Sequence, residues 1–337
     1  MTRYLARRIT LSLVVVAGVV LLTFVIARIV PGDPATSWAG PHATAAQVAQ
    51  ARKHLGLNRP FIDQVGTYFR GIIVGHWGTS IHTHRPVLSD LKTAVPASLE
   101  LVIAAILIAI AVGVPLGLLA ARLRGRATDH AVRAVAIVGV SMPIFWLSLI
   151  LQLVFFNQFH LLPVAGEYAL RFQENPVHAY THFPVIDAVL AGNWAMLGSS
   201  ISHLVLPACA VAAYPTGVIA RMVRASVLDV AGETHVQMLR AFGFREGTIF
   251  NRFAMRLAWN PVAQVVALVF AYSLVNTFLV ESIFDWPGLG SYAGESIIAL
   301  DTPAIVGITL FVALVYVFVN LAVDLIQAAL DPRIRLQ

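Results

Sequence analysis

Few side chains in this sequence have the types and spacing that metal binding or catalysis would require. His82 and His84 form a His-x-His pair, and His76 lies nearby. In an extended segment, residues two apart face the same side, so two imidazoles could share a metal ion. The alternative is a solvated polar loop that is rich in His because Lys is scarce. We favour the polar loop and predict no metal site.

A phosphate-binding loop of the Walker A type is absent from the sequence. That loop needs Gly-Lys-Ser/Thr, because backbone amides and a lysine hold the phosphates. Lys53 is followed by His54, and Lys92 is preceded by Leu91, so neither lysine can serve. Gly-x-Ser-x-Gly and His-Glu-x-x-His are also absent. We therefore predict that the chain is not an enzyme and binds no cofactor itself.

The composition is that of an integral membrane protein. Of 337 residues, 58% are hydrophobic and only 12% are charged, whereas soluble domains average about 25% charge. The net charge of +6 could suggest nucleic acid, but the cations flank apolar runs, which the positive-inside rule explains. We predict no nucleic-acid partner. Cys209 is the single cysteine and excludes an intrachain disulfide.

Six stretches are long and apolar enough to cross a bilayer as helices. We place them at about 9–29, 97–121, 132–156, 203–223, 259–280 and 304–328. The fourth contains Pro207 and Pro215 and is expected to kink there. The fold class is all-α, with six transmembrane helices. Residues 1–96 would form the first transmembrane helix and a long extracytoplasmic loop, and 97–337 a core of five helices.

The arginines predict the orientation of these spans. With six spans, fifteen of the twenty-three Lys and Arg residues fall on one side of the membrane. Loops 31–96, 157–202 and 281–303 fall on the other side, and the last of them has no cation. The positive-inside rule therefore places both termini in the cytoplasm. In the first outer loop, 44–55 is expected to be a helix between an N-cap Thr44 and Gly56.

The cytoplasmic segment 224–259 is rich in arginine and has an organised pattern. Residues 226–242 fit one helix, and Gly243 would end it because glycine accepts the left-handed conformation of a helix terminus. A second helix would place Ile249, Phe253 and Leu257 on one apolar stripe. Two interpretations remain open at this point: a docking helix for a partner, or a surface helix whose arginines touch lipid headgroups.

Polar residues inside the spans are candidates for a translocation pathway, because each is costly in hydrocarbon. They are Gln264, Asn276 and Asn320, with Gln152 in the third span. Gly113 and Gly117 would let a neighbouring helix approach closely, for packing or along a pathway. No ladder of acids crosses the membrane, which disfavours a proton-coupled carrier.

Several short motifs, in order along nearly the whole chain, resemble one family: the permease subunits of ATP-binding-cassette importers, specifically the B-type of dipeptide/oligopeptide systems. The motifs are 3–8 (RYLARR), 30–34 (VPGDP), 55–60 (LGLNRP), 98–101 (SLEL), 113–117 (GVPLG), 143–147 (PIFWL), 162–163 (LP), 281–284 (ESIF), 287–290 (PGLG), 301–303 (DTP) and 331–335 (DPRIR). Their order and spacing together are highly specific. The resemblance implies a type I importer permease fold.

The resemblance also implies a site within the segment of about 225–258. In that family this loop carries a coupling motif that docks in a cleft of the ATPase. The matching positions are His235, Val236, Met238, Arg240, Ala241, Phe242, Gly243 and Phe244. Arg240, Ala241 and Gly243 fit the family pattern. His235, Met238, Phe242 and Arg245 depart from it, so the contacts with the ATPase are expected to differ in detail.

The function that the resemblance implies is ATP-driven, binding-protein-dependent import through the cell inner membrane. The implied partners are a second homologous permease, one or two cytoplasmic ATPases that use ATP and Mg, an extracytoplasmic substrate-binding protein, and membrane lipid. Peptides are the expected cargo, with nickel chelates or oligosaccharides as alternatives. A secondary carrier that works without ATP is a remoter alternative.

Overall fold

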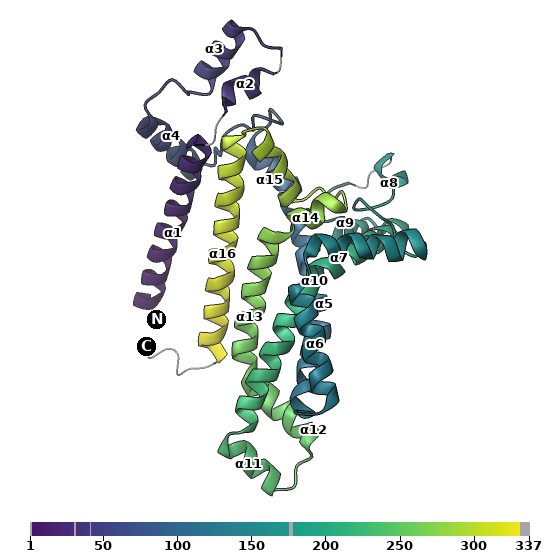
Figure 1. Cartoon of the computed structure of the whole chain (residues 1–337). Helices are drawn as coiled ribbons and strands as arrows, with labels where there is room; N and C mark the ends of the chain where they lie inside the picture. The colour runs from purple at the N-terminus through teal and green to yellow at the C-terminus, as the bar shows by residue number, and fades with distance from the viewer. Residues whose placement is uncertain (1, 30–31, 41, 175–177, 331–337) are drawn as a thin grey trace. The chain divides into compact units, whose positions relative to one another are not determined.

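The computed structural model describes residues 2–29, 32–40, 42–174 and 178–330. Within these ranges the chain is helical, and its β structure is one isolated bridge between Thr79 and Pro86 (Figure 1). The motif at 331–335 and the first two residues of the motif at 30–34 lie outside the described residues. The all-α prediction is therefore confirmed for the described part of the chain.

The chain divides into two compact units. The first contains residues 1–97 and 287–318, and the second contains 98–286 and 319–337. Residues 287–318, which the sequence analysis assigned to the second region, group here with the first. The helices α5 and α16 each begin in the first unit and end in the second.

Among the residues that the structure describes, seven helices contribute to the first unit. They are α1 (Thr2–Ile29), α2 (Pro34–Ala39), α3 (Ala45–His54), α4 (Phe61–Ile73), the start of α5 (Val87–Arg122), α15 (Leu289–Ile298) and the first part of α16 (Thr302–Leu330). Two apolar clusters join five of these helices. One joins α5, α15 and α16 around Val87, Tyr292 and Ile308. The other joins α1, α4 and α16 around Phe24 and Leu310.

The predicted outer-loop helix is confirmed with its caps. The Thr44 side chain accepts from the backbone N–H of Gln47, and the Gln47 side chain accepts from the Thr44 N–H, which forms a capping box. At the other end Gly56 has φ +66, as the terminus of a helix favours.

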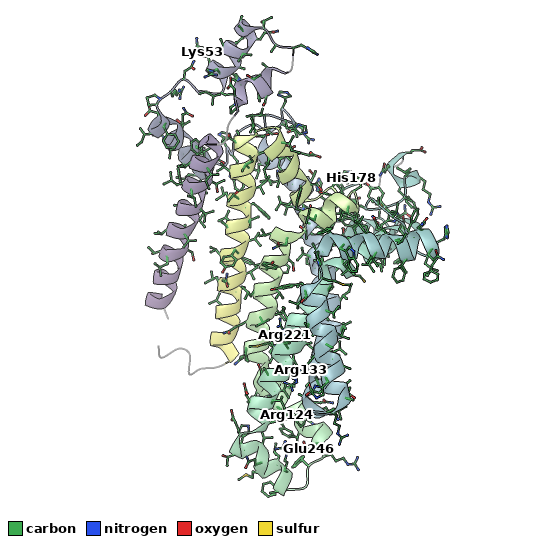
Figure 2. All side chains as sticks on the ribbon, in the orientation of Figure 1. Lys53, Arg124, Arg133, His178, Arg221 and Glu246 are labelled. Atoms are coloured by element: carbon green, nitrogen blue, oxygen red, sulfur yellow. The ribbon has the colours of Figure 1, made fainter. Side chains whose placement is uncertain are left out.

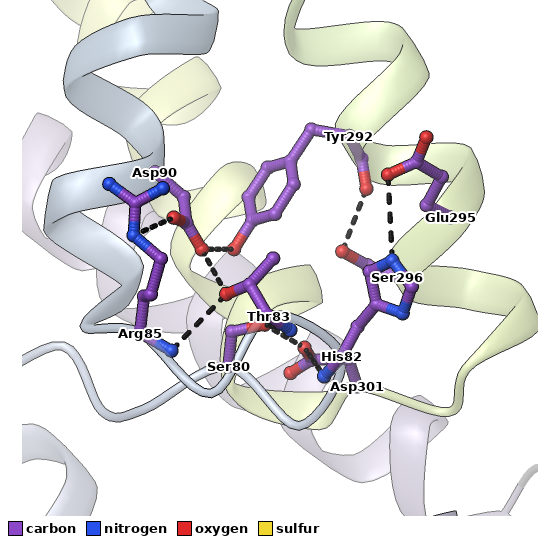
Figure 3. A network of polar contacts seen from close by, with 9 residues as sticks. All are labelled: Ser80, His82, Thr83, Arg85, Asp90, Tyr292, Glu295, Ser296 and Asp301. Carbon is purple, nitrogen blue, oxygen red and sulfur yellow. Dashed lines mark hydrogen bonds and ion pairs between the residues drawn. The ribbon is translucent and has the colours of Figure 1, made fainter.

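A buried polar network joins the loop before α5 to α15 and α16 (Figure 3). Asp301 is fully buried; it accepts from the Ser80 hydroxyl and from the backbone N–H of His82. Its other oxygen accepts from the Ala304 N–H at 3.0 Å and so caps α16. Asp90 accepts from the hydroxyls of Thr83 and Tyr292. The 301–303 motif is thus a helix cap that also fixes a distant loop.

Replacing Asp301 with alanine should destabilise the chain by at least about 2 kcal/mol, because buried donors that lose their partner cost ~1–3 kcal/mol each. Thermal unfolding of the purified chain in detergent measures this. Glu295→Ala is the control, since its contact with His82 is exposed at 3.8 Å and is worth less than about 1 kcal/mol. Equal effects of the two substitutions would contradict the proposed role of Asp301.

The second unit is organised around one long helix, α10 (Trp194–Ala231), which packs against α6 and α13. Its other elements are the end of α5, α6 (Ala127–Ser141), α7 (Ile144–Leu151), η1 (Gln152–Gln158), α8 (Arg171–Glu174), α9 (Pro184–Leu190), α11 (Thr234–Ala241), α12 (Glu246–Thr248), η2 (Ile249–Ala254), α13 (Met255–Asn276) and α14 (Phe278–Ile283). The helix α10 begins nine residues before the predicted 203 and continues through Pro207 and Pro215 without ending.

The third predicted span, 132–156, is not one straight helix. The helix α6 ends at Ser141, and the next helical pair, 144–158, departs at 102° (Figure 1). Pro143 explains the break, because the residue before a proline avoids the helical conformation. Met142 accordingly has ψ 128, in the extended region.

The six predicted spans are mostly helical where the structure describes them, with a break at Met142 and Pro143 in the third, and they differ in length and apolar character. Among the described residues, four helices are long and apolar enough to cross a membrane: Val87–Arg122, Trp194–Ala231, Glu246–Asn276 and Thr302–Ala322. The bent pair could supply a fifth, and Thr10–Ile26 is a shorter apolar helix. The chain is therefore a multi-pass membrane protein with at least four candidate spans.

Candidate functional site

The predicted single helix over 226–242 is wrong, because the chain turns between α10 and α11. The helix α10 ends at Ala231, and Glu233 adopts an extended conformation with ψ 151. Gly232 lies at the turn as the C-cap of α10. This end is not evident from the sequence, because Gly243 is the stronger helix terminator in the same stretch. The result is a separate eight-residue helix, α11, at the end of a long one.

Gly243 ends α11, as predicted. It has φ +79, where residues other than glycine are strained. Its N–H donates to the carbonyl of Arg240 at 2.9 Å, and the Phe244 N–H donates to that of Leu239. A Cβ at Gly243 would meet nothing within 4 Å, so the backbone conformation rather than space requires glycine here.

Two side chains attach α11 to its neighbours. Val236 is fully buried. The Arg240 guanidinium donates to the Ala231 carbonyl at 3.0 Å and to the Glu246 carboxylate at 2.8 Å. Arg240 therefore connects the end of α10 to the start of α12 and sets the position of α11 between them.

The remaining surface of α11 and its exit carries large apolar side chains. Met238, Phe242 and Phe244 are exposed, and Phe242 is 73% exposed. His235 is also exposed and lies 3.1 Å from the Glu233 carboxylate. Exposed apolar residues that lie close together with polar residues around them are typical of protein or membrane interaction sites.

The second helix of the segment buries a different stripe from the one predicted. Ile249 is buried, but Leu257 is 52% exposed, and Ala254 and Ala258 are buried instead. The helix begins with the π-helical turns of η2, Ile249–Ala254. A π turn bonds residues five apart, so it rotates the buried face away from the i, i+4 stripe that an α-helix would give.

An ion pair that the sequence analysis missed joins α6 to α10. Asp129 is 1% exposed and accepts two bonds from the Arg224 guanidinium, at 2.7 and 2.8 Å. It also accepts from the Gly125 N–H at 3.0 Å. The available signal was an acid in the first turn of α6, directly after a run of arginines.

The same end of the second unit carries many of the cations counted in the sequence. Figure 2 labels three of these cations toward the end that carries α11: Arg124, Arg133 and Arg221. The acidic Glu246 is labelled at the same end. A Cβ at Gly247 would overlap the Arg122 guanidinium, so α12 lies against the end of α5. The segment 224–258 is therefore packed against α5, α6 and α10 and is not an extended loop.

The predicted pathway residues take separate positions. A Cβ at Gly117 would lie 2.6 Å from the Ala220 carbonyl oxygen, and one at Gly113 would lie 3.0 Å from that of Thr216. Both glycines therefore allow α5 to contact α10. Asn276 donates to the Tyr272 carbonyl on its own helix, α13. Gln264 is exposed on α13, and Asn320 is partly exposed on α16. Their role in a pathway stays a prediction.

Gln152, the remaining polar residue predicted inside a span, supports the bend. Its side-chain amide donates to the carbonyls of Val164 and Ile283, at 3.0 and 3.1 Å. Two motifs far apart in the sequence also meet, because the Ser98 hydroxyl donates to the fully buried Glu281 carboxylate. Ser98 of the motif at 98–101 and Glu281 of the motif at 281–284 therefore have structural roles.

The two histidines of the His-x-His pair, His82 and His84, have different partners. His82 faces the Glu295 carboxylate at 3.8 Å, and the ring of His84 packs edge-on against Trp38 at 4.6 Å. Within the described ranges, no three His, Cys, Asp or Glu side chains are grouped so as to hold a metal ion.

Comparison with known proteins places this architecture in a family. Residues 113–336 match the family model of the binding-protein-dependent transport system inner membrane component, and residues 1–102 match its N-terminal counterpart. The chain is 40% identical to the probable D,D-dipeptide transport system permease protein DdpB of Escherichia coli K12, over 95% of this chain and 94% of that protein. It is 36% identical to the dipeptide transport system permease protein DppB of Alkalihalophilus pseudofirmus, over 99% and 100%. It is also 36% identical to the di/tripeptide transport system permease protein DppB of Pseudomonas aeruginosa, over the full length of both. The chain belongs to the family of binding-protein-dependent transport system inner membrane components.

Proposed function

We propose that this chain is a permease subunit of an ATP-driven importer for di- and oligopeptides. It forms the translocation pathway with a second, homologous permease and works by alternating access. The proposal is supported by the family to which the chain belongs and by the peptide cargo in the names of several relatives of nearly equal length.

The proposed topology has six transmembrane helices with both termini in the cytoplasm. The fifteen Lys and Arg residues predicted on one side support this orientation. The α6–α7 pair forms the third span in this arrangement, with its bend at Pro143. The protein is located in the cell inner membrane in this proposal, and the end that carries α11 faces the cytoplasm.

The helix α11 is the proposed coupling element. The observation that carries this proposal is its geometry: Val236 and Arg240 anchor α11 to α10 and α12, while Met238, Phe242 and Phe244 are exposed for a partner. An anchored helix transmits movement, whereas a loose one absorbs it. The proposed partners of α11 are cytoplasmic ATPase subunits, which are copies of one protein or two different proteins. They bind and hydrolyse ATP with Mg.

Substrate reaches the outer face on an extracytoplasmic binding protein, which selects the cargo. Nickel chelates or oligosaccharides remain alternative cargoes for the same class of importer. The second permease, the ATPases and the binding protein are expected to be encoded beside this chain.

Reconstitution tests the proposal. Proteoliposomes that contain this chain, its partner permease and the ATPases should accumulate a labelled dipeptide only when ATP and the binding protein are supplied. Proteoliposomes with this chain alone should accumulate none. Uptake by the chain alone, driven by an ion gradient, would instead establish a secondary carrier. ATP-dependent uptake of a nickel chelate or oligosaccharide but no dipeptide would reject the cargo and retain the importer class.

A further inference from the structure

The first unit contains a cavity of about 480 Å³ beside α1 and α4. This volume lies within the ~300–1,000 Å³ range of small-molecule sites. Its apolar walls come from four separate stretches of chain: Phe24, Leu55, Leu57, Val74, Ile81 and Pro303. The size and walls suit a hydrocarbon group.

The polar groups of the cavity favour an anion. Arg59 and Arg70 line it and are exposed. Among the described residues, neither guanidinium has a carboxylate within 4.0 Å, and no Asp or Glu lines the cavity. Each guanidinium that lines the cavity offers a planar set of N–H donors, to which a carboxylate or phosphate can bind through two oxygens.

Tyr68 supplies a further donor that has no partner. Its side chain lines the cavity, and its buried hydroxyl has no hydrogen-bond partner in the structure. Burial raises the pKa of Tyr68, so the hydroxyl stays protonated. A buried donor of this kind is costly unless a ligand oxygen accepts from it.

The cavity lies beside an amphipathic helix. One face of α4 packs Val65, Tyr68 and Ile72 against the cluster around Phe24. Its ends leave Ile62 and Ile73 exposed, Ile73 by 84%. Apolar residues exposed in this way on a short amphipathic helix are buried when the helix lies in the membrane interface. Phe24 lies near the end of the apolar helix Thr10–Ile26, so in the proposed topology, on which this inference rests, the cavity lies near the outer surface of the bilayer.

We propose that this cavity binds an anionic phospholipid, with an acyl chain between the apolar walls and the phosphate at Arg59 and Arg70. A small shift of the Tyr68 ring would let its hydroxyl, which is buried in this structure, donate to an oxygen of the glycerol ester region. A transported peptide fits less well, because its ammonium group would meet two cations and no carboxylate. The lipid would fix α4 on the membrane and support the loop that α3 and α4 form.

Native mass spectrometry of the full-length chain in detergent tests this site with phosphatidylglycerol as the probe. Phosphatidylglycerol should bind at least about tenfold more tightly than phosphatidylcholine of the same chains. Arg59→Gln with Arg70→Gln should remove that preference, since charge-assisted hydrogen bonds are lost. Lys53→Gln with Arg171→Gln removes the same charge from exposed positions outside the cavity and should leave the binding unchanged.

Two single substitutions keep the test decisive if the double variant does not fold. Thr67→Trp fills the cavity and should weaken both lipids, and Tyr68→Phe should weaken phosphatidylglycerol several-fold. Equal binding of the two lipids by the unaltered chain would overturn the proposal. So would displacement of the lipid by millimolar inorganic phosphate, which would identify a free-anion site, or by a dipeptide, which would identify a substrate site.

Discussion

Replacing Gly243 with proline is expected to abolish uptake while the protein still inserts into the membrane. Proline fixes φ near −65° and lacks an N–H, whereas Gly243 has φ +79 and donates to the Arg240 carbonyl. Proline also disfavours the helical conformation of the residue before it, and Phe242 has ψ 4 as the C-cap of α11. The end of α11 must therefore rearrange, and the proposed contact with the ATPase is expected to be lost. Dipeptide uptake in proteoliposomes and ATPase activity stimulated by the binding protein measure the effect.

Two glycine-to-alanine variants give the controls. Gly232→Ala should transport at nearly the unaltered rate, because Gly232 has φ −81 and its added Cβ would make only an ordinary contact at 3.4 Å with the Asp229 carbonyl oxygen. The uptake rate of Gly243→Ala should lie between those of Gly243→Pro and Gly232→Ala, since the left-handed conformation costs a non-glycine residue about 1–2 kcal/mol. Unchanged uptake by the proline variant would refute a coupling role for α11.

Removing Arg224 is expected to destabilise the chain by about 3–5 kcal/mol, because the Asp129 charge is left buried without a partner. Removing Asp129 should cost less, because the Arg224 side chain is 23% exposed and can reach water. Asp129 is almost fully buried, and its two oxygens accept from Arg224 and from the Gly125 N–H. Asp129→Asn and Arg224→Met should each lower the unfolding temperature in detergent by several degrees. The double variant should recover part of the loss, since it contains neither unpaired charge.

The matched control is the ion pair Arg240–Glu246 at the far side of α11. Both of its side chains are exposed, and exposed pairs contribute less than about 1 kcal/mol. Glu246→Gln should therefore leave the unfolding temperature nearly unchanged. If Asp129→Asn were equally harmless, or if the double variant were as unstable as the sum of the singles, the pair would not hold α6 to α10.

Local features of this protein were predictable from sequence because they depend on residues close together in the chain. The Thr44–Gln47 capping box and the stops at Gly56 and Gly243 each follow from side chains and backbone conformations within a few residues. The helical class and the six apolar stretches follow from composition and length. The family was also predictable from sequence, because its motifs are recognised by their order along the chain and this requires no knowledge of the packing.

The sequence-based predictions were wrong where the period of a helix, or the residue at which it ends, depends on packing against other helices. The 3.6-residue period placed Leu257 on the buried stripe, but the π turns of η2 shift that stripe to Ala254 and Ala258. The break at Gly232 and the 102° bend after Ser141 interrupt patterns that are apolar or amphipathic on both sides. Periodicity alone does not detect a change of direction within such a pattern.

Composition, hydropathy and motifs were enough to establish the membrane class, the apolar stretches and the family, and they predicted the segment that we propose couples to a partner. Only the tertiary structure decided which distant groups meet: Asp129 with Arg224, Asp301 with Ser80, and Arg59 and Arg70 around one cavity with Tyr68. The physical reason is that charge, hydropathy and helix termini are set by neighbours in the chain. Long-range hydrogen bonds, ion pairs and cavities, by contrast, form once the helices have packed; the hydrogen bond between Ser80 and Asp301 joins residues 221 positions apart.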